Sequence, residues 1–344
     1  MRHSWGETFD IPTGYLNTAS IGIPPGRVAE AMRTALERWA QGRTTVAEYD
    51  PPVAAARQGY ADLIGVPVSS VTIGGSASAL IGLVAAAVPD GARVLVADDE
   101  FTSVTYPFAV HRPRGVVVDS RPLAELPGAA PGYDWVAVSV TQSTDGAMID
   151  LDGLREATER AGTRVLLDVT QTAGWMPLHL DWADAVVCAG YKWLLSPRGA
   201  AWMALRPDTA AGIRPLAANW YAGADLQGSM YGLTPELHAD ARRFDASPAW
   251  LSHVSAGVAL PWLASLDLEA VRAHAVGLAN RLRAGLGLPP GDSPILSLDG
   301  FDGASRTLDE AGVSHAVRGG SIRLSCHLYS TEEDVAAAIA VLTP

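Results

Sequence analysis

Apolar and amphipathic segments alternate through the middle of the chain, which is the pattern expected of an α/β fold. The run 135–140 is apolar except at Ser139, as is typical of a strand covered on both faces. The amphipathic segment 150–162 has an acidic start and a glycine stop, so it is predicted to be a helix. A largely apolar helix is predicted at about 77–88. Further strands are predicted at 70–73, 93–97, 115–118, 165–168, 185–188 and 200–205.

A stretch rich in proline, glycine and aromatic residues, 214–231, separates this pattern from the C-terminal part of the chain. A helical region is predicted around 253–282, followed by a strand at 321–325 and a final helix. The residues Ser330-Thr-Glu-Glu333 that open this helix fit a capping box. We therefore expect a large sheet domain up to about residue 260 and a smaller domain after it.

Length and composition predict a two-domain protein with a large core, because 48% of the 344 residues are hydrophobic and 18% are charged. The net charge of −12 provides no basic surface for nucleic acid. The longest apolar stretch, 79–88, is too short to cross a membrane. The two cysteines and the histidines show no metal-ligand or disulfide spacing. We therefore predict a cytoplasmic protein without a nucleic-acid, membrane or metal partner.

Lysine occurs once in the chain, at Lys192, and the other 24 of the 25 basic residues are arginine. A guanidinium stays protonated, whereas a desolvated lysine amine can lose its proton and attack a carbonyl. Lys192 is therefore a candidate covalent catalyst. On composition alone, an ordinary surface lysine left over in an arginine-rich chain explains the observation equally well.

Three predicted strand ends carry groups that together suit one ligand. Gly74-Gly-Ser-Ala-Ser78 opens a helix and suits a phosphate, although such a cap often holds no ligand. Asp168 ends a buried strand and needs a cationic or hydrogen-bond-donating partner. Lys192 follows a third strand, between Tyr191 and Trp193. A phosphate anchor, a pyridinium partner and an imine-forming amine predict pyridoxal 5′-phosphate (PLP) as the cofactor. Walker and dinucleotide-binding glycine motifs are absent from the sequence.

The segments 165–180 and 184–199 carry the order D-x-x-Q…G-[HY]-K-x(5)-[RG]-G and resemble the class V aminotransferase family. This fold type I PLP-dependent group contains cysteine desulfurases, kynureninase and isopenicillin N epimerase. The resemblance extends from Tyr15-Leu-Asn-Thr-Ala19 to the C-terminal helix. It implies an α/β fold with a large, mostly parallel, seven-stranded sheet domain at 21–260 and a smaller α+β domain at 261–344. Residues 1–20 are expected to line the active site.

The resemblance also implies roles for individual residues around the cofactor. Lys192 is expected to form the Schiff base, Asp168 to contact the pyridine nitrogen and Gln171 to contact the ring oxygen. The family supplies one phosphate ligand from the partner subunit, so a homodimer with the active site at its interface is implied. The remaining expected cofactor contacts are Phe101 stacked on the ring, Gly75, Ser76, Ala77 and Tyr191 at the phosphate, and Ser247 and, less directly, Trp220 from the partner subunit.

An amino acid or a related amine, as a small-molecule substrate, is what the resemblance implies. Arg323 matches the arginine that grips the substrate α-carboxylate, a task for which its fork of donors is suited. An ion pair at a strand end is the alternative for this residue. Ser143 stands where desulfurases have a substrate-side asparagine, and Asn17 belongs to the N-terminal segment expected beside the substrate.

Cysteine desulfurases carry a nucleophilic cysteine before this arginine, but residues 308–315 contain none. Cys188 lies in a predicted buried strand and Cys326 follows Arg323, so both are predicted to be core residues. We therefore predict an aminotransferase. A PLP-dependent lyase that cleaves a C–S or C–C bond and a non-catalytic protein that retains the fold are the alternatives. Dependence on an acceptor oxo-acid distinguishes the first two, and absence of any half-reaction would indicate the third.

Overall fold

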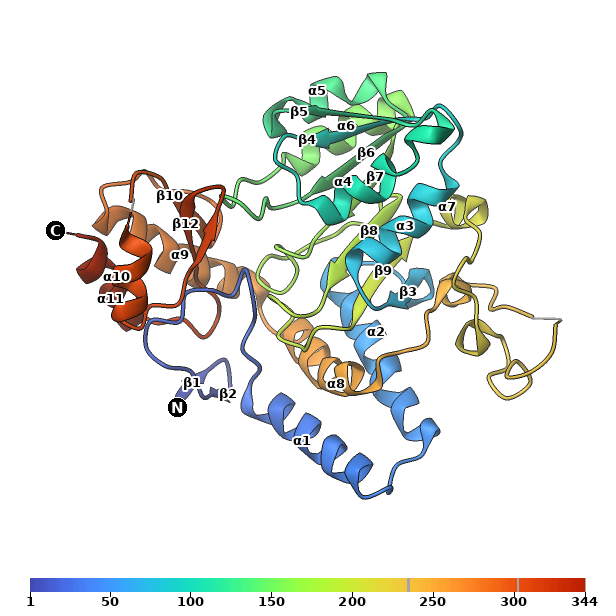
Figure 1. The fold of residues 1–344 in the computed structure, drawn as a ribbon, viewed down its shortest axis with the longest axis horizontal. Coiled ribbons are helices and arrows are strands. Elements are labelled where there is room, and N and C mark those ends of the chain that lie inside the picture. Colours follow the sequence, from blue (N-terminus) through green and yellow to red (C-terminus); the bar gives the residue numbers. More distant parts are fainter. Residues whose placement is uncertain (234–235, 302, 344) are drawn as a thin grey trace.

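A seven-stranded sheet forms the centre of the computed structural model, which describes residues 1–233, 236–301 and 303–343 (Figure 1). The strand order is β3-β9-β8-β7-β6-β4-β5. β9 runs antiparallel to both of its neighbours, and the other neighbouring pairs are parallel, which confirms the predicted mostly parallel sheet. The strands are β3 (Val71–Gly74), β4 (Arg93–Ala97), β5 (Val117–Arg121), β6 (Trp135–Ser139), β7 (Arg164–Asp168), β8 (Ala185–Ala189) and β9 (Ala201–Leu205).

The two faces of the sheet belong to two different hydrophobic cores. In β6, Val136 and Val138 face one core, whereas Trp135 and Ala137 face the other. This alternation is the period of two that a strand imposes, and burial on both sides explains why the strand sequences are almost continuously apolar. The helices that supply the first core include α2 (Asp50–Ile64), α6 (Leu151–Ala161) and α8 (Trp250–Ala264), and those that supply the second include α3 (Ala77–Ala87) and α4 (Thr102–Ala109).

Strand β5 begins two residues later than the sequence pattern suggested. Gly115 has a φ of 79° and ends a 3-10 turn at Arg112–Arg114, so the extended backbone cannot start there. The helix predicted at 150–162 is confirmed as α6. The side chain of Asp150 caps its start, and the left-handed Gly162 ends it.

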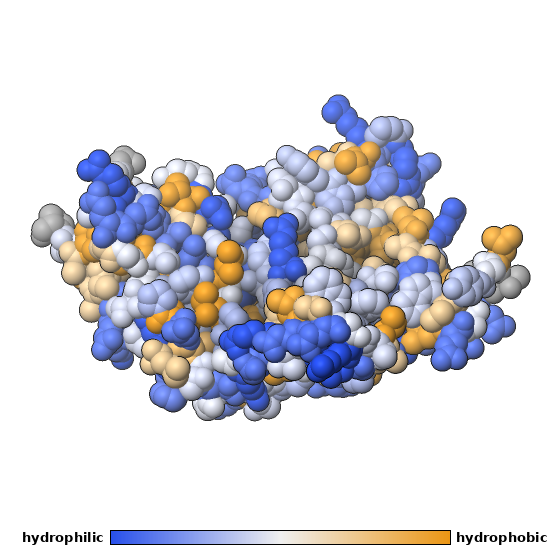
Figure 2. Space-filling view, turned by 60° about the horizontal axis from the view of Figure 1, so that its bottom comes forward, coloured by the Kyte–Doolittle hydropathy of each residue, from blue (hydrophilic) through white to orange (hydrophobic). Residues whose placement is uncertain are grey.

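The N-terminal region adds elements that the sequence pattern did not reveal. β1 (Arg2–Ser4) and β2 (Glu7–Phe9) form a short hairpin, and α1 (Gly26–Ala40) packs along α8. In Figure 1, α1 lies at the bottom of the molecule, and the same face seen in Figure 2 is covered mostly by hydrophilic side chains. The remaining helices of the large sheet region are the short α5 (Leu126–Ala129) and α7 (Pro207–Gly212).

A three-stranded antiparallel sheet of order β10-β12-β11 forms the core of the C-terminal part, with Leu16 from the N-terminal segment packed against it. The predicted helical region around 253–282 is in fact two helices, because Asp267 caps the second by accepting from the backbone of Glu269 and Ala270. We propose that the domain boundary lies at this break, between α8 and α9. The elements here are α9 (Leu268–Gly285), β10 (Ile295–Leu298), α10 (Ala304–Glu310), β11 (Ala316–Arg318), β12 (Ser321–Ser325) and α11 (Glu332–Leu342).

Among the described residues, no single helix has both the length and the apolar character needed to cross a bilayer. Only α8 and α9 taken together, which meet at a bend of 94°, reach that length and composition.

The capping box of α11 lies one residue later than expected, on Thr331 and Asp334. Ser330 cannot serve as the cap because its hydroxyl accepts from the backbone N–H of His327. Asp334 also accepts from the backbone of Gly14 and pairs with Arg2. The start of α11 therefore holds the N-terminal segment against the small sheet.

A buried ion pair joins α2 to the segment that precedes α8, and strand β3 donates hydrogen bonds to it. Arg57 donates two hydrogen bonds to Asp245, at 3.0 and 2.6 Å, and Thr72 and Ile73 donate to the same carboxylate. Burial raises the pKa of Asp245, and the Arg57 charge opposes that shift. Because Ala246 also donates to the carbonyl of Ile73, this network fixes Ser247 close to the end of β3.

We predict that Asp245→Asn lowers the free energy of unfolding by about 3 kcal/mol, because the buried Arg57 charge loses its partner. Urea denaturation followed by tryptophan fluorescence measures the change. Glu159→Gln, which removes the partner of Arg155 in an exposed pair on α6, is the matched control and should leave the transition where it is. An equally small effect of both substitutions would contradict the role given to the buried pair.

Candidate active site

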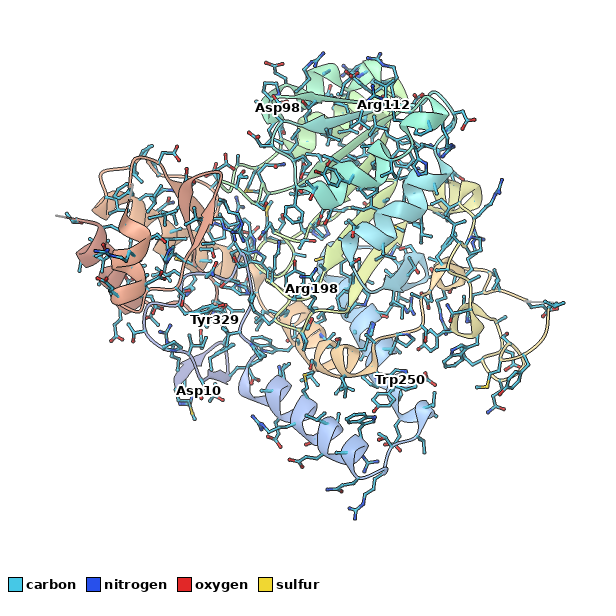
Figure 3. All side chains as sticks on the ribbon, in the orientation of Figure 1. Asp10, Asp98, Arg112, Arg198, Trp250 and Tyr329 are labelled. Atoms are coloured by element: carbon cyan, nitrogen blue, oxygen red, sulfur yellow. The ribbon has the colours of Figure 1, made fainter. Side chains whose placement is uncertain are left out.

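Two adjoining cavities lie between the carboxyl edge of the large sheet and the small sheet. The larger has a volume of about 570 Å³ and is bounded by the N-terminal segment, α1 and the strands β11 and β12. The smaller is bounded by the ends of β3, β6, β7 and β8. Arg198, near the middle of the molecule in Figure 3, lines both. The other residues shared by the two cavities are Phe101, Ser143, Tyr191 and Lys192.

Lys192 lies at the junction of the two cavities, three residues beyond β8, and is 7% exposed. Burial lowers the pKa of its ammonium to about 8. The Asp168 carboxylate raises the pKa, and the Arg323 charge lowers it. The Nζ atom lies 5.4 Å from the ring centroid of Phe101 and 5.7 Å from that of Tyr191. The only lysine of the chain is therefore held where its amine loses a proton near pH 8 rather than near pH 10.5.

The N-terminal segment closes over the loop that carries Lys192. Gly22 donates its backbone N–H to the carbonyl of Tyr191 at 2.9 Å. A side chain at Gly22 would collide with the carbonyl of Lys192, so glycine permits this close approach. The segment thereby removes Lys192 from solvent.

Asp168 ends β7 and is 5% exposed, beside the end of β6, where Ser139 is its register partner. The backbone N–H of Thr170 donates to its Oδ1 at 2.8 Å. Burial raises the pKa of Asp168, whereas the hydrogen bonds from Thr170 and the Lys192 charge lower it. A carboxylate in this setting suits a cationic partner such as a protonated ring nitrogen.

The first turn of α3 forms the opposite end of the smaller cavity. Ser76 is the N-cap, and its hydroxyl accepts from the backbone N–H of Ala79. Gly75, Ala77 and Ser78 line the cavity beside it. The first N–H groups of a helix have no partners within the helix, and the dipole there favours an anion. This end of the cavity therefore suits a phosphate.

Phe101 begins α4 with its ring at both cavities, and the residue that holds it was not predicted from the sequence. The buried carboxylate of Glu100 accepts four hydrogen bonds, from the Phe101 backbone, the Ser139 backbone, the Ser139 hydroxyl and the Gln142 amide. Glu100 therefore ties the start of α4 to the end of β6. A charged residue directly after a buried strand, in Asp98-Asp-Glu100, was the available signal.

Gln171 is oriented by contacts at both atoms of its amide. Its Oε1 accepts from the indole of Trp193 at 2.7 Å, and its Nε2 donates to the carbonyl of Ala19 at 3.0 Å. This arrangement leaves the second N–H of the amide for a ligand in the smaller cavity, which Gln171 lines. Trp193 is fully buried, and His327 contacts its ring edge-on. Trp193 was not predicted as a site residue, although it follows Lys192 directly.

Arg323, in the centre of β12, is 2% exposed and lines the larger cavity. Its guanidinium donates to the carbonyl of Ser143 and, at 2.7 Å, to the hydroxyl of Ser20. Its Nε is buried and has no partner among the described groups. Burial lowers the pKa of Arg323 to about 10, with a further contribution from Arg318. A donor left free in this way suits a carboxylate.

Three predicted site residues are not among those that line the two cavities. The amide of Asn17 donates to the carbonyl of His315, on the small domain. Trp220 is half-buried and Ser247 is exposed, both away from the cavities of this chain. Their roles toward substrate and partner subunit stay predictions. Cys188 and Cys326 are fully buried, so neither thiol reaches the cavities.

The residues that are present fit PLP. The first turn of α3 suits its phosphate, Asp168 its ring nitrogen, and Lys192 its aldehyde, while Phe101 provides a ring face close to the amine. These groups come from four different strand ends, and the fold brings them to one cavity.

Comparisons with known proteins agree with this fit. The sequence model of the class-V aminotransferase family matches residues 16–291. An uncharacterized aminotransferase, YcbU of Bacillus subtilis, is 27% identical over 314 residues, which cover 83% of this chain and 81% of that protein. The isopenicillin N epimerase of Streptomyces clavuligerus is 27% identical over 327 residues and 81% of each chain.

Solved structures show the same fold. The cystine C–S lyase C-DES, in complex with its product cysteine persulfide, has a TM-score of 0.84 at 21% identity, covering 96% of this chain and 97% of that one. The cysteine desulfurase CsdA of Escherichia coli has a TM-score of 0.82 at 20% identity, covering 97% and 95%. The chain therefore belongs to the class-V aminotransferase family, with the fold type I architecture and the PLP cofactor of that family.

Proposed function

We propose that this protein is a PLP-dependent enzyme that transfers the amino group of an amino acid, with Lys192 as its catalytic base and cofactor attachment point. The observation that carries the proposal is the position of the only lysine. Lys192 is desolvated at the junction of a smaller cavity that suits a phosphate and a larger cavity lined by Arg323. A lysine kept only for charge gains nothing from this burial, since burial lowers the pKa of its amine.

When bound, PLP supplies an aldehyde that captures an amine and a ring that draws electrons from the substrate Cα. Asp168 holds a proton on the ring nitrogen, which strengthens that effect. Arg323 binds the substrate α-carboxylate through paired donors and so orients the Cα–H bond. The Lys192 amine would take the Cα proton as general base and hold it at Nζ for return. Phe101 and the N-terminal segment at Gly22 limit the access of water.

We further propose that the enzyme acts as a homodimer. Ser247 and Trp220 lie outside the cavities of their own chain, while the network around Asp245 fixes Ser247 in position. The nearby stretch 216–233 exposes Leu216, Met230, Tyr231 and Leu233, with Tyr231 at 92%. An exposed apolar set of this kind suits a protein partner. A second copy would cover it and bring Ser247 to the neighbouring phosphate site.

Epimerisation is the second candidate reaction, because it shares the removal of the Cα proton and two relatives of this chain are isopenicillin N epimerases. The desulfurase route has no support in this chain, since both thiols are buried in the cores. Three measurements on one amino-acid panel distinguish the reactions. Product formation with and without an oxo-acid identifies transamination, which requires that acceptor. Inversion of the Cα configuration with exchange of the Cα hydrogen, in the absence of an acceptor, identifies epimerisation. Release of ammonia in the absence of an acceptor identifies a lyase.

The pH dependence of Lys192 gives the first prediction. In protein freed of cofactor, acetic anhydride should modify Lys192 with a midpoint near pH 8, because burial holds its pKa at about 8. The unfolded chain should show a midpoint near pH 10.4. Mass spectrometry of peptides separates Lys192 from the N-terminal amine. Asp168→Asn should move the midpoint below 8, because the carboxylate raises this pKa, whereas Glu159→Gln on α6 should not. A native midpoint near 10 would contradict the desolvated amine.

Replacement of Lys192 gives the second prediction. Lys192→Ala should lose at least about a thousandfold in turnover, the range expected for a missing proton-transfer group together with the missing attachment point. Borohydride treatment should add the cofactor mass to the parent protein but not to the variant. Lys192→Arg is the charge-matched control and should fail equally, since a guanidinium neither attacks the aldehyde nor accepts the proton. Turnover within tenfold of the parent in either variant would exclude Lys192 as the catalytic base.

A further inference from the structure

The larger cavity carries more positive charge than the proposed chemistry uses. Its lining contains Lys192 and the three arginines Arg198, Arg318 and Arg323. No Asp or Glu is among its lining residues within the described parts of the chain. This imbalance is notable in a protein of net charge −12. Cations left without carboxylates around a cavity indicate an anionic ligand.

The register of the small sheet brings two of these arginines together. In the antiparallel pair β11–β12, Ala316 lies opposite Arg323 and Arg318 lies opposite Ser321. Residues directly opposite each other share a face, and so do residues two apart along one strand. Arg318 and Arg323 therefore project from the same face as diagonal neighbours. The charge of Arg318 is also felt at Arg323 and Lys192, where it lowers both pKa values.

The three arginines differ in which cavity they reach. Arg198 lines both cavities and packs over the Tyr191 ring, beside the phosphate-binding end. Arg323 is the buried fork for the α-carboxylate. Arg318 lines only the larger cavity, is exposed at its rim, and donates to the carbonyl of its neighbour Val317. Neither cofactor nor α-carboxylate accounts for Arg318.

The wall of the larger cavity provides room for a substrate side chain. Ile21, Pro24, Val28, Ala29 and Met32 form an apolar surface from the N-terminal segment and α1. Methylene groups can lie along this surface, and a group at their end can reach the cavity rim. The combination fits a chain of a few carbons that ends in an anion.

We propose that the substrate is an amino acid with a second carboxylate at the end of its side chain, which Arg318 binds while Arg323 binds the α-carboxylate. This inference rests on the proposed function. Arg318 is a specificity-determining residue, because it contacts the distal group and leaves the reacting Cα to Lys192.

Matched amino-acid pairs test the proposal on the holoenzyme. Glutamate is compared with norvaline and 2-aminoadipate with norleucine, so that the pairs differ only in the terminal carboxylate. Dissociation constants come from the first change in the cofactor spectrum on rapid mixing. The parent should bind the dicarboxylates at least about tenfold more tightly, as expected for a charge-assisted pair. Arg318→Gln should abolish this preference and leave norvaline binding within about twofold, whereas Arg323→Gln should weaken both members of each pair.

The controls separate the possible failures. Arg121→Gln, on the exposed end of β5, removes the same charge at a residue that lines neither cavity and should change nothing. Arg318→Lys keeps the charge and should retain part of the preference, so it serves if Arg318→Gln loads cofactor poorly. Equal binding within each pair, or a preference that persists in Arg318→Gln, would overturn this inference alone. A holoenzyme whose spectrum responds to no amino acid would overturn the proposed function itself.

Discussion

Desolvation of a single amine is the constraint around which this structure is organised. The ammonium of Lys192 is buried beside the buried carboxylate of Asp168, and neither charge would be tolerated at that depth without the other or a bound ligand. Three separate parts of the fold determine the surroundings of the Lys192 amine. The ends of β7 and β8 bring the two groups to one edge, the N-terminal segment covers the lysine loop through Gly22, and Arg323 adds a second positive charge that lowers the pKa of the amine. Exposure of the lysine loop or removal of the Arg323 charge would return the pKa of Lys192 toward its ordinary value, whereas removal of the Asp168 carboxylate would lower it further.

Much of the large domain could be predicted because its strands are buried on both faces. Burial of this kind makes a strand sequence apolar over four or five consecutive residues, and β4, β6 and β8 show that pattern plainly. Elements whose positions depend on distant partners escaped prediction. The β1–β2 hairpin is stabilised against the C-terminal region, through Arg2 and Asp334 for example. The cap of α11 shifted by one residue because Ser330 was already engaged by His327. Such competition between local and distant hydrogen bonds leaves little local signal.

The residues of the candidate site also fall into those that could be predicted from the sequence and those that could not. Lys192, Asp168 and the turn at Gly75 could be identified because each follows directly on a buried strand, where parallel sheets place their ligands. Glu100 and Trp193 act through hydrogen bonds to residues 39 and 22 positions away, so their importance became visible only once β6, β7 and the lysine loop were in contact. Ser247 and Trp220 remain predictions because the proposed contact lies between two chains. The register of β11 and β12 that makes Arg318 and Arg323 diagonal neighbours likewise has no counterpart in the linear sequence.

The contacts of Arg323 explain how one residue can orient a substrate and also hold the two halves of the site together. One terminal nitrogen donates to the carbonyl of Ser143, which follows the large sheet, and the other donates to Ser20 of the N-terminal segment. The buried Nε is left free. A carboxylate that binds along the edge formed by Nε and the nitrogen now shared with Ser20 gains two parallel hydrogen bonds without disturbing Ser143. The contact to Ser143 then fixes the plane of the guanidinium. A carboxylate bound to it would therefore have a fixed orientation relative to the sheet edge that carries Lys192 and Asp168. Under the proposed function, Arg323 would bind the carboxylate with one side of its guanidinium while the other side stays bonded to Ser143.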